Sequence, residues 1–482
     1  MNLVQTSIRI VAAAALAGAA ATVVVATRAG PAPIAGPARP ALQTIELGGT
    51  GFRTVALTAT DPGQAGHAIK PFALLGATWS DPRAALGVSV EVRTQALAGH
   101  RWSAWRTLAV DEPTAADPGS PGRGGTDPIW VGDSDGVQTR IVGAAPIPAG
   151  LRLDLINPDS GEPLLVPSAY RQPAAIRSIG RGQARYQPRP APNLVSRTGW
   201  GANESIVLKR PAYTTDVQVL FVHHTADPGA YNCADSPRIV RGIEAYHVRS
   251  KGWNDIGYNF LVDKCGKLFE GRRGGETRPV LGAHTLGFNQ RSAAIAVIGD
   301  YRNTGVSATV ENVIAQVAAY KIGMYGNLAS GRTTLVSTGS DRYAEGATAA
   351  LNRISGHRDT GRTECPGDAL YAQLPAIRAI AAAGPAHLRL SKLTGAVRSG
   401  RGYFYTKGTI RPLWTTSTPS GLMNRFDVSV DGRLVVSAPR SHRTTTLNLG
   451  PGKRVLTIRA VHLSGRTAST TVTVYSGRRP PR

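Results

Sequence analysis

The pattern of apolar residues changes twice along the chain, and this limits the folds that it can adopt. Residues 42–172, and the chain from about 386 onward, contain short runs in which apolar and polar side chains alternate, such as GVSVEVRTQ and RFDVSVDGRLVVSA. Alternation with a period of two is typical of strands that bury one face. Between these parts, VQVLFVHH at 217–224 is almost continuously apolar, which is typical of a strand buried on both faces. The sequence therefore predicts more than one kind of domain.

A chain of 482 residues is also too long for a single hydrophobic core. We expect residues 42–172 to form a β-rich accessory domain, a β-sandwich or jelly roll. Residues 173–195 are rich in Pro and Arg, and we expect them to form an extended linker. Residues 385–482 contain an Asp-Gly hairpin turn and two further alternating strands, which predict an immunoglobulin-like β domain with a basic tail.

Residues 196–384 alternate between strand and helix patterns, which predicts an α/β domain with a mixed β-sheet and surrounding helices. Its expected elements are a strand at 217–224, a helix from 236 toward 252, a hairpin turning at 264–266, a strand at 293–300 and a helix over 310–320. The expected fold is thus multidomain, with a central α/β domain flanked by two all-β domains.

The first 41 residues combine an uncharged apolar run at 10–26 with a Pro/Ala-rich spacer. This layout is typical of an export signal. The alternative is an uncleaved membrane anchor, because a run of 17 residues is at the lower limit for crossing a bilayer. We expect a secreted or cell-wall protein, which is attached to a membrane only if this segment is retained.

The chain contains three cysteines, Cys233, Cys265 and Cys365. Export permits disulfides, so one bridge can form and one cysteine is left over. The segment GHRDTGRTECPG at 356–367 places Cys365 eight residues after His357, where a thiol is a nucleophile, half of a disulfide or a metal ligand. The cysteines alone leave all three uses open.

Five of the ten histidines lie in the central part of the chain: His223, His224, His247, His284 and His357. His223 and His224 end an expected buried strand, the place where an open α/β sheet presents its ligands. Two imidazoles and a thiolate suit Zn²⁺, and three protein ligands leave a fourth position for water. The alternative for any single histidine is a buried, hydrogen-bonded side chain.

The chain has 55 Lys and Arg against 31 Asp and Glu, a formal charge of +24. This excess favours an anionic partner such as nucleic acid, acidic lipid or a cell-wall polyanion, and charge alone does not choose among them. Nucleic acid does not suit an exported chain, so anionic cell-wall polymers are an expected partner. Arg-rich composition from GC-rich codon use is the alternative explanation.

Four segments of the central part carry a resemblance to a known family. They are FVHHTA, GWNDIGYNFLVDKCGKLFEGR, GAHTLGFNQRSAAIAVIGDY and SGHRDTGRTECPG. In order and register they resemble the type 2 N-acetylmuramoyl-L-alanine amidases, the family that includes the peptidoglycan recognition proteins. The resemblance covers residues 196–384 and does not extend to the flanking domains.

The resemblance implies a zinc site and two catalytic residues. The family's zinc ligands correspond to His223, His357 and Cys365, and its catalytic tyrosine corresponds to Tyr258. Thr363 takes a position that is Lys in phage members and Thr in recognition proteins with amidase activity. Inactive recognition proteins resemble this motif with Ser in place of the cysteine, so the cysteine here favours a working enzyme.

The implied reaction is hydrolysis of the amide bond between the lactyl group of N-acetylmuramic acid and L-alanine in peptidoglycan. Trp253, His284 and Asn289 are expected to line the cleft. Arg272, with Arg273 and Arg278 as alternatives, is expected to bind the carboxylates of the stem peptide, unless these charged side chains are merely solvated.

With Cys365 assigned to zinc, the remaining pair, Cys233 and Cys265, fits a disulfide. Two other functions remain open. One is a non-catalytic peptidoglycan-binding protein, because binding and hydrolysis use the same groove. The other is a cysteine hydrolase that uses Cys365 and His357, although no orienting Asn stands in a known register.

Overall fold

The computed structural model describes residues 40–47, 54–58, 69–110, 122–159, 189–227 and 231–477. The export or anchor segment at 1–39, most of the linker and the last five residues of the basic tail lie outside these described residues. Within them, no helix is both long enough and apolar enough to cross a bilayer.

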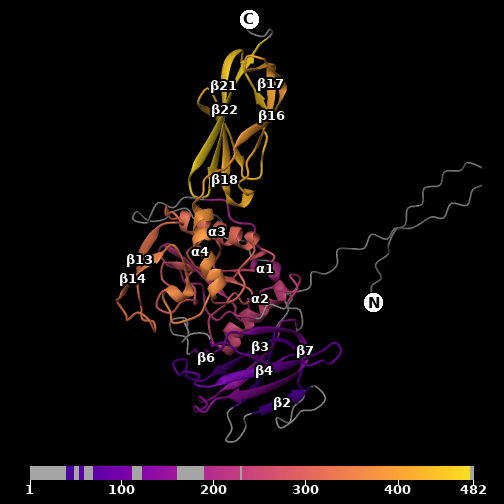
Figure 1. Ribbon diagram of the computed structural model, residues 1–482, viewed down its shortest axis with the longest axis vertical. Coiled ribbons are helices and arrows are strands. Elements are labelled where there is room, and N and C mark those ends of the chain that lie inside the picture. Colours follow the sequence, from indigo (N-terminus) through magenta and orange to yellow (C-terminus); the bar gives the residue numbers. More distant parts are fainter. Residues whose placement is uncertain are drawn as a thin grey trace, which may run out of the picture. The chain divides into compact units, whose positions relative to one another are not determined.

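The N-terminal part is an antiparallel β domain, in line with the β-rich pattern of its sequence (Figure 1). Eight strands among its described residues are hydrogen-bonded in the order β1-β8-β3-β7-β4-β5, with β2 beside β7 and β6 beside β3. The strands are β1 (Ala41–Glu46), β2 (Thr54–Thr58), β3 (Phe72–Trp79), β4 (Ser89–Ala96), β5 (Arg106–Thr107), β6 (Gly124–Gly125), β7 (Ile129–Val142) and β8 (Arg152–Asn157). Their alternate apolar side chains form a core of their own, centred on residues such as Leu75, Val90 and Leu153.

The central part contains a five-stranded mixed sheet in the order β11-β10-β12-β9-β15. Strands β10, β12, β9 and β15 are parallel, and β11 is antiparallel to β10. The strands are β9 (Val219–His224), β10 (Phe260–Val262), β11 (Leu268–Glu270), β12 (Ser292–Val297) and β15 (Ile354–Gly356). The mixed sheet and the hairpin turn before β11 agree with the sequence pattern.

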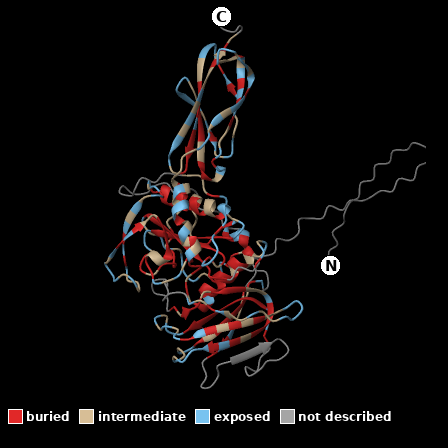
Figure 2. Cartoon of the chain, viewed as in Figure 1, coloured by how far each residue is buried: buried red, intermediate tan, exposed pale blue. Residues whose placement is uncertain are grey.

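Helices cover both faces of this sheet. The helices are α1 (Arg197–Trp200), α2 (Ser236–Ala245) continued by the π-helical turn η2 (Tyr246–Ser250), α3 (Ala308–Gly323) and α4 (Asp368–Ala382). Ile295 of β12 belongs to the core cluster that contains Ile314 of α3, whereas its neighbour Ala296 belongs to the cluster that contains Ile243 of α2. Successive strand residues point to opposite faces, so a strand between two helix layers must be apolar throughout. Figure 2 shows buried residues, in red, throughout the central part.

Several elements of the central part have no counterpart in the sequence-based expectation, including α1, β15, a hairpin and a long helix. A hairpin, β13 (Arg332–Val336) and β14 (Thr348–Asn352), forms a separate two-stranded sheet. Helix α4 packs against α3 and β15 and contains Pro375. Leu370, Leu374, Ile377 and Ala381 of α4 do follow helical spacing, but a proline inside such a stripe argues against a helix.

The C-terminal part contains seven strands, in the order β16-β17-β22-β21-β18-β19 with β20 beside β17. They are β16 (Arg389–Arg398), β17 (Phe404–Thr415), β18 (Met423–Val430), β19 (Arg433–Pro439), β20 (Leu447–Asn448), β21 (Gly452–His462) and β22 (Thr467–Ser476), with a short 3-10 turn η4 (Ser420–Leu422). The expected turn at Asp431-Gly432 connects β18 to β19. The immunoglobulin-like arrangement stays a prediction.

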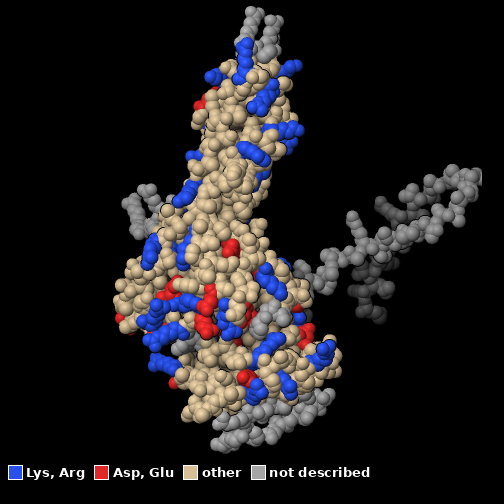
Figure 3. Space-filling view, viewed as in Figure 1, with Lys and Arg blue, Asp and Glu red and all other residues tan. Residues whose placement is uncertain are grey.

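Positive charge is concentrated in this C-terminal part. Residues 385–482 contain 17 Lys and Arg against 2 Asp and Glu, which is more than half of the net charge of +24. Figure 3 shows Lys and Arg side chains over its visible face.

Candidate metal centre and substrate cavity

Three side chains that could hold a metal ion meet at one edge of the central sheet. Val222 of β9 lies opposite Gly356 of the parallel strand β15, so the residues that follow them, His223 and His357, are neighbours. Their ring centroids are 4.5 Å apart. The third residue, Cys365, completes a cluster whose potential ligand atoms all lie within 4.8 Å of one another. The carboxyl ends of two parallel strands therefore create the cluster.

The loop between β15 and α4 places Cys365. Its sulfur lies 3.6 Å from Nδ1 of His223, and the backbone N–H of His224 points to the same sulfur at 3.4 Å. Thr363 Oγ1 accepts the backbone N–H of Cys365 at 3.0 Å, and the N–H of Arg358 donates to the Cys365 carbonyl group at 3.0 Å. These bonds fold the loop onto itself and fix the cysteine next to the histidines.

The His223 ring is held in a form suited to binding a metal. Burial, followed by the neighbouring rings of His357, His284 and His224, lowers the pKa of His223 well below its usual value. Nε2 of His223 lies 3.4 Å from Thr285 Oγ1, so a proton on Nε2 leaves Nδ1 free to face Cys365. A neutral imidazole fixed through its second nitrogen is the usual form of a metal-bound histidine. The two imidazoles and one thiol form a donor set that fits a borderline-soft divalent ion.

The structure places Tyr258 beside this cluster. Its ring centroid is 5.3 Å from that of His223 and 5.7 Å from that of His247. The preceding Gly257 donates its N–H to Nδ1 of His247 at 3.1 Å, which fixes the backbone before the tyrosine. Tyr258 is buried, with 9% of its surface exposed, and it lines the cavity described below.

A cavity of about 540 Å³ opens onto the cluster. Besides the three potential ligands, it is lined by Tyr258, Thr363, Trp253 and His284. Nε2 of His284 and Nε1 of Trp253 are buried and have no hydrogen-bond partner among the residues that the structure describes. Both atoms are therefore available for polar groups of a ligand.

The remaining residues expected to bind substrate lie elsewhere. Arg272 is buried, and its guanidinium group donates to the backbone carbonyl oxygens of Asp255, Ile256 and Leu281. Asn289 Oδ1 accepts the backbone N–H groups of His284 and Thr285 at 2.9 and 3.0 Å. Neither residue lines the cavity. Their geometry favours a role in fixing cavity loops over the substrate contacts that the sequence suggested.

The two alternative arginines also have local partners. Arg273 pairs with Glu204 at 3.5 Å, and the Arg278 guanidinium group lies 3.5 Å from the centroid of the Tyr213 ring. Neither of them lines the cavity.

One polar residue near the cluster, Thr285, was missed in the sequence, and His224 lies behind the cluster. Thr285 links His223 to His284 through its hydroxyl group, with 3.0 Å between Thr285 Oγ1 and Nδ1 of His284. Its position directly after His284 was the only available signal. His224 is buried near Asp300, with 3.9 Å between Nδ1 and Oδ1, and it accepts the backbone N–H of Tyr301. His224 thus packs behind the cluster.

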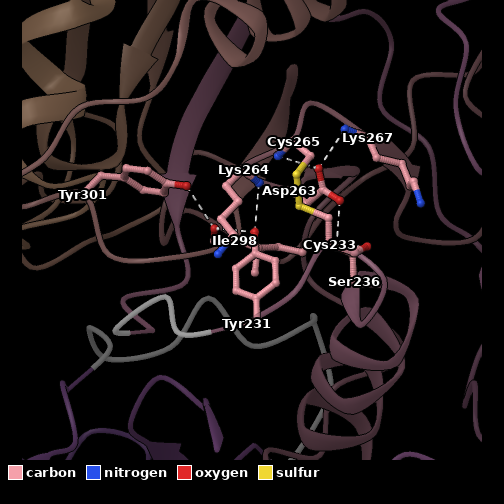
Figure 4. The surroundings of a disulfide bond; sticks show 9 residues. All are labelled: Tyr231, Cys233, Ser236, Asp263, Lys264, Cys265, Lys267, Ile298 and Tyr301. Atoms are coloured by element: carbon pink, nitrogen blue, oxygen red, sulfur yellow. Dashed lines mark hydrogen bonds between the residues drawn. A yellow bond between two sulfur atoms is a disulfide. The ribbon is translucent and has the colours of Figure 1, made fainter. Parts of the chain in front are cut away.

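The two other cysteines, Cys233 and Cys265, form a disulfide, as expected. Figure 4 shows the bridge between the start of α2 and the turn before β11. Asp263 Oδ2 accepts the Ser236 hydroxyl group at 2.7 Å, and its Oδ1 accepts the N–H groups of Cys265 and Lys267. The bridge and this carboxylate together fasten α2 to the β10–β11 hairpin.

Comparison with known proteins identifies two regions of the chain. Residues 213–368 match the family described as N-acetylmuramoyl-L-alanine amidase, and residues 33–163 match one described as Rv3811 N-terminal galactose-binding domain-like. The chain is 30% identical over 181 residues to peptidoglycan-recognition protein SC2 of Drosophila simulans, covering 38% of this chain and 84% of that protein.

Two further proteins are similar over the same region. A human N-acetylmuramoyl-L-alanine amidase is 36% identical over 155 residues, which are 32% of this chain and 23% of that protein. The solved structure of Drosophila PGRP-LB is 26% identical with a TM-score of 0.31, and the match covers 38% of this chain and 93% of that one. The chain belongs to the family of peptidoglycan recognition proteins and N-acetylmuramoyl-L-alanine amidases.

Proposed function

We propose that the protein is an exported, zinc-dependent N-acetylmuramoyl-L-alanine amidase that hydrolyses the lactyl–L-alanine amide bond of peptidoglycan. The observation that carries this proposal is the cluster of His223, His357 and Cys365 in a cavity that Tyr258 also lines. Relatives include a human protein named for this activity and a Drosophila structure described in complex with the muropeptide tracheal cytotoxin.

In this proposal His223, His357 and Cys365 hold the zinc ion. Zinc with three protein ligands supplies Lewis-acid chemistry, since it polarises an amide carbonyl group and makes a water molecule more acidic. The zinc ligands that the sequence resemblance implies are the three residues of this cluster.

The residues around the cluster have separate roles. The Tyr258 hydroxyl group orients the attacking water or donates to the oxygen that becomes negative in the transition state. Thr363 fixes Cys365 through the backbone bond described above, and its hydroxyl group is a further donor near the reacting carbonyl.

The buried nitrogens of the cavity supply binding. If the proton of His223 lies on Nε2 and the Thr285 hydroxyl group donates to His284 Nδ1, the proton of the neutral His284 lies on Nε2. His284 Nε2 and Trp253 Nε1 would then both donate to carbonyl oxygens of the muropeptide.

Two observations support the wider role of the chain. The Cys233–Cys265 disulfide is typical of an oxidising compartment and so supports export. The C-terminal part, with 17 basic and 2 acidic residues, suits retention on anionic cell-wall polymers.

The test is to incubate the purified full chain with cell-wall peptidoglycan and to identify the released products by mass spectrometry. An amidase releases stem peptides with a free L-alanine amino group, loses this activity with EDTA and regains it with Zn²⁺. A non-catalytic recognition protein binds the material and releases nothing. A cysteine hydrolase resists EDTA and is stopped by alkylation of Cys365, and either of these results would refute the proposal.

A further inference from the structure

The cavity over the candidate metal centre has a wall that does not belong to the amidase domain. One side is formed by the residues described above, including His223, Tyr258 and Cys365. The other side is formed by residues 82–86 between β3 and β4, with Ala109, Val110 and Asp127 of the N-terminal domain. A ligand next to the metal centre therefore also meets the N-terminal domain.

This wall is held by a buried contact with η2. Tyr246 is fully buried, and its hydroxyl group lies 3.0 Å from the backbone carbonyl oxygens of both Ala77 and Thr126. A Cβ atom on Gly76 would lie 2.7 Å from the Tyr246 ring, so glycine is required for this close approach. The same core cluster contains Leu74 of β3 and Ile243 of α2. Apolar burial and hydrogen bonds thus connect the two domains.

Polar contacts fix the same interface at its edge. Asp227 Oδ2 accepts the backbone N–H of Trp130 at 2.6 Å, although 97 residues separate them. Arg238 of α2 pairs with Asp133 at 2.6 Å and also with Asp159. Trp130 and Asp133 both lie on β7, so these contacts hold this strand against the amidase domain.

Two arginines face this cavity from opposite sides. Arg83 comes from the N-terminal domain and Arg362 from the loop that contains Cys365. Both are exposed, and among the described residues neither guanidinium group has a hydrogen-bond or ion-pair partner. A third cavity arginine, Arg302, is already paired with Asp300 at 2.6 Å. Arg83 and Arg362 are therefore the cavity cations that remain available to an anionic ligand.

We propose that the N-terminal domain completes the substrate site and that Arg83 binds a carboxylate of the peptidoglycan stem peptide. This inference rests on the proposed function for the identity of the ligand. A guanidinium group pairs with a carboxylate through two parallel N–H donors, and this geometry discriminates against an amidated stem. The N-terminal domain thereby determines which stem peptides bind next to the metal centre.

The test measures binding by the full chain in EDTA, so that the muropeptide is not hydrolysed during the titration. Calorimetry gives the Kd of a muropeptide with free stem carboxylates and of its amidated counterpart, for the parent and for Arg83→Gln. The matched control is Arg101→Gln, an exposed arginine of the same domain that does not line the cavity. Circular dichroism and the melting temperature establish that each variant is folded.

We expect Arg83→Gln to weaken binding of the carboxylate form about three- to fivefold, as for an exposed ion pair, and to leave the amidated form nearly unchanged. Arg101→Gln should alter neither. Unchanged binding of both forms, or an equal loss for both, would overturn the inference. If the unsubstituted chain binds the muropeptide but does not hydrolyse it, only the amidase proposal is refuted. If the unsubstituted chain hydrolyses the muropeptide and Arg83→Gln does so equally well, only the proposal for Arg83 is refuted.

Discussion

The sulfur of Cys365 lies 3.6 Å from Nδ1 of His223, although 142 residues separate them in the sequence. The parallel pairing of β9 and β15 makes this approach possible, because it brings the residues after both strands to one edge of the sheet. The Thr285 hydroxyl group contacts the His223 ring, and Thr363 accepts the backbone N–H of Cys365. The predictions below test the parts of this arrangement separately.

Tyr258 is expected to act in the chemical step. Tyr258→Phe keeps the ring that packs beside His223 and removes only the hydroxyl group. We expect kcat to fall at least roughly tenfold, within the range of positioned acid–base groups, while metal content and muropeptide Kd stay unchanged. Steady-state kinetics and calorimetry measure these quantities. An unchanged kcat in a folded, metal-loaded variant would show that only the ring matters.

The disulfide is expected to stabilise the fold, and its removal should not change metal binding. Replacing Cys233 and Cys265 together by Ser opens a loop that spans 32 residues, which should lower the free energy of unfolding by about 2–4 kcal/mol. Denaturant titration measures the loss, and metal content should stay at the parental value. Peptide mapping of the unreduced parent should find Cys365 as a free thiol, and a bridge that includes Cys365 would contradict the account.

Arg197 is expected to stabilise, through ion pairs, the segment that precedes Tyr258. Its guanidinium group pairs with Glu244 at 2.7 Å and Asp255 at 3.3 Å, and both acids are buried. Asp255 in turn accepts the backbone N–H groups of Ile256 and Arg273, next to the segment that contains Tyr258. Arg197→Met leaves buried carboxylates without their cation, which should cost about 3–5 kcal/mol.

The matched variant for this prediction is Arg197→Met combined with Glu244→Gln. Burial raises the pKa of Glu244 to about 7 despite the nearby Arg197, so a neutral side chain is tolerated at this position. We expect the double variant to recover part of the lost unfolding free energy in urea titrations. A double variant that is less stable than the single one would argue against the electrostatic explanation.

The C-terminal domain is expected to lose stability in acid through His462. Burial, with the charges of Arg189 and Arg466, lowers the pKa of His462 to about 4, and its Nδ1 accepts the N–H of Ser464 at 3.0 Å. The unfolded chain, with an ordinary histidine pKa near 6.5, therefore binds more protons than the folded chain. The stabilising contribution is complete above pH 6.5 and is lost as the pH falls through 4.

Unfolding titrations between pH 7 and 4 measure this effect in the parent and in His462→Asn. The asparagine can still accept the Ser464 N–H but does not titrate in this range. We expect a smaller pH dependence in the variant. Equal slopes for both proteins would exclude His462 as the source.

The sequence predicted those parts of the fold that local patterns determine. The continuous apolar run ending at His223 became β9, and the stripe ending at Tyr246 became α2 and η2. Helix α4 was missed because Pro375 interrupts its pattern. Hydrophobic periodicity reports the burial of one element, and a proline inside a helical stripe argues against the helix that the stripe indicates.

The residues of the candidate site were also predicted only in part from the sequence. The motifs around His223, His357 and Cys365 pointed to residues that the fold brings together. Arg272 was expected at the substrate because arginine suits carboxylates, but in the fold its donors serve three backbone carbonyl groups. The role of Arg83 could not be read from the sequence, since it depends on how the N-terminal domain packs against η2.

The central claim is that His223, His357 and Cys365 together bind zinc. Its most direct test is the metal content of the purified full chain, measured by mass spectrometry, beside that of Cys365→Ser. The variant removes one soft ligand and makes little change in size. We predict about one zinc ion per parent chain, and a marked loss of zinc in the variant with its fold preserved. A parent chain without zinc after loading, or a variant that retains the full amount, would contradict the claim.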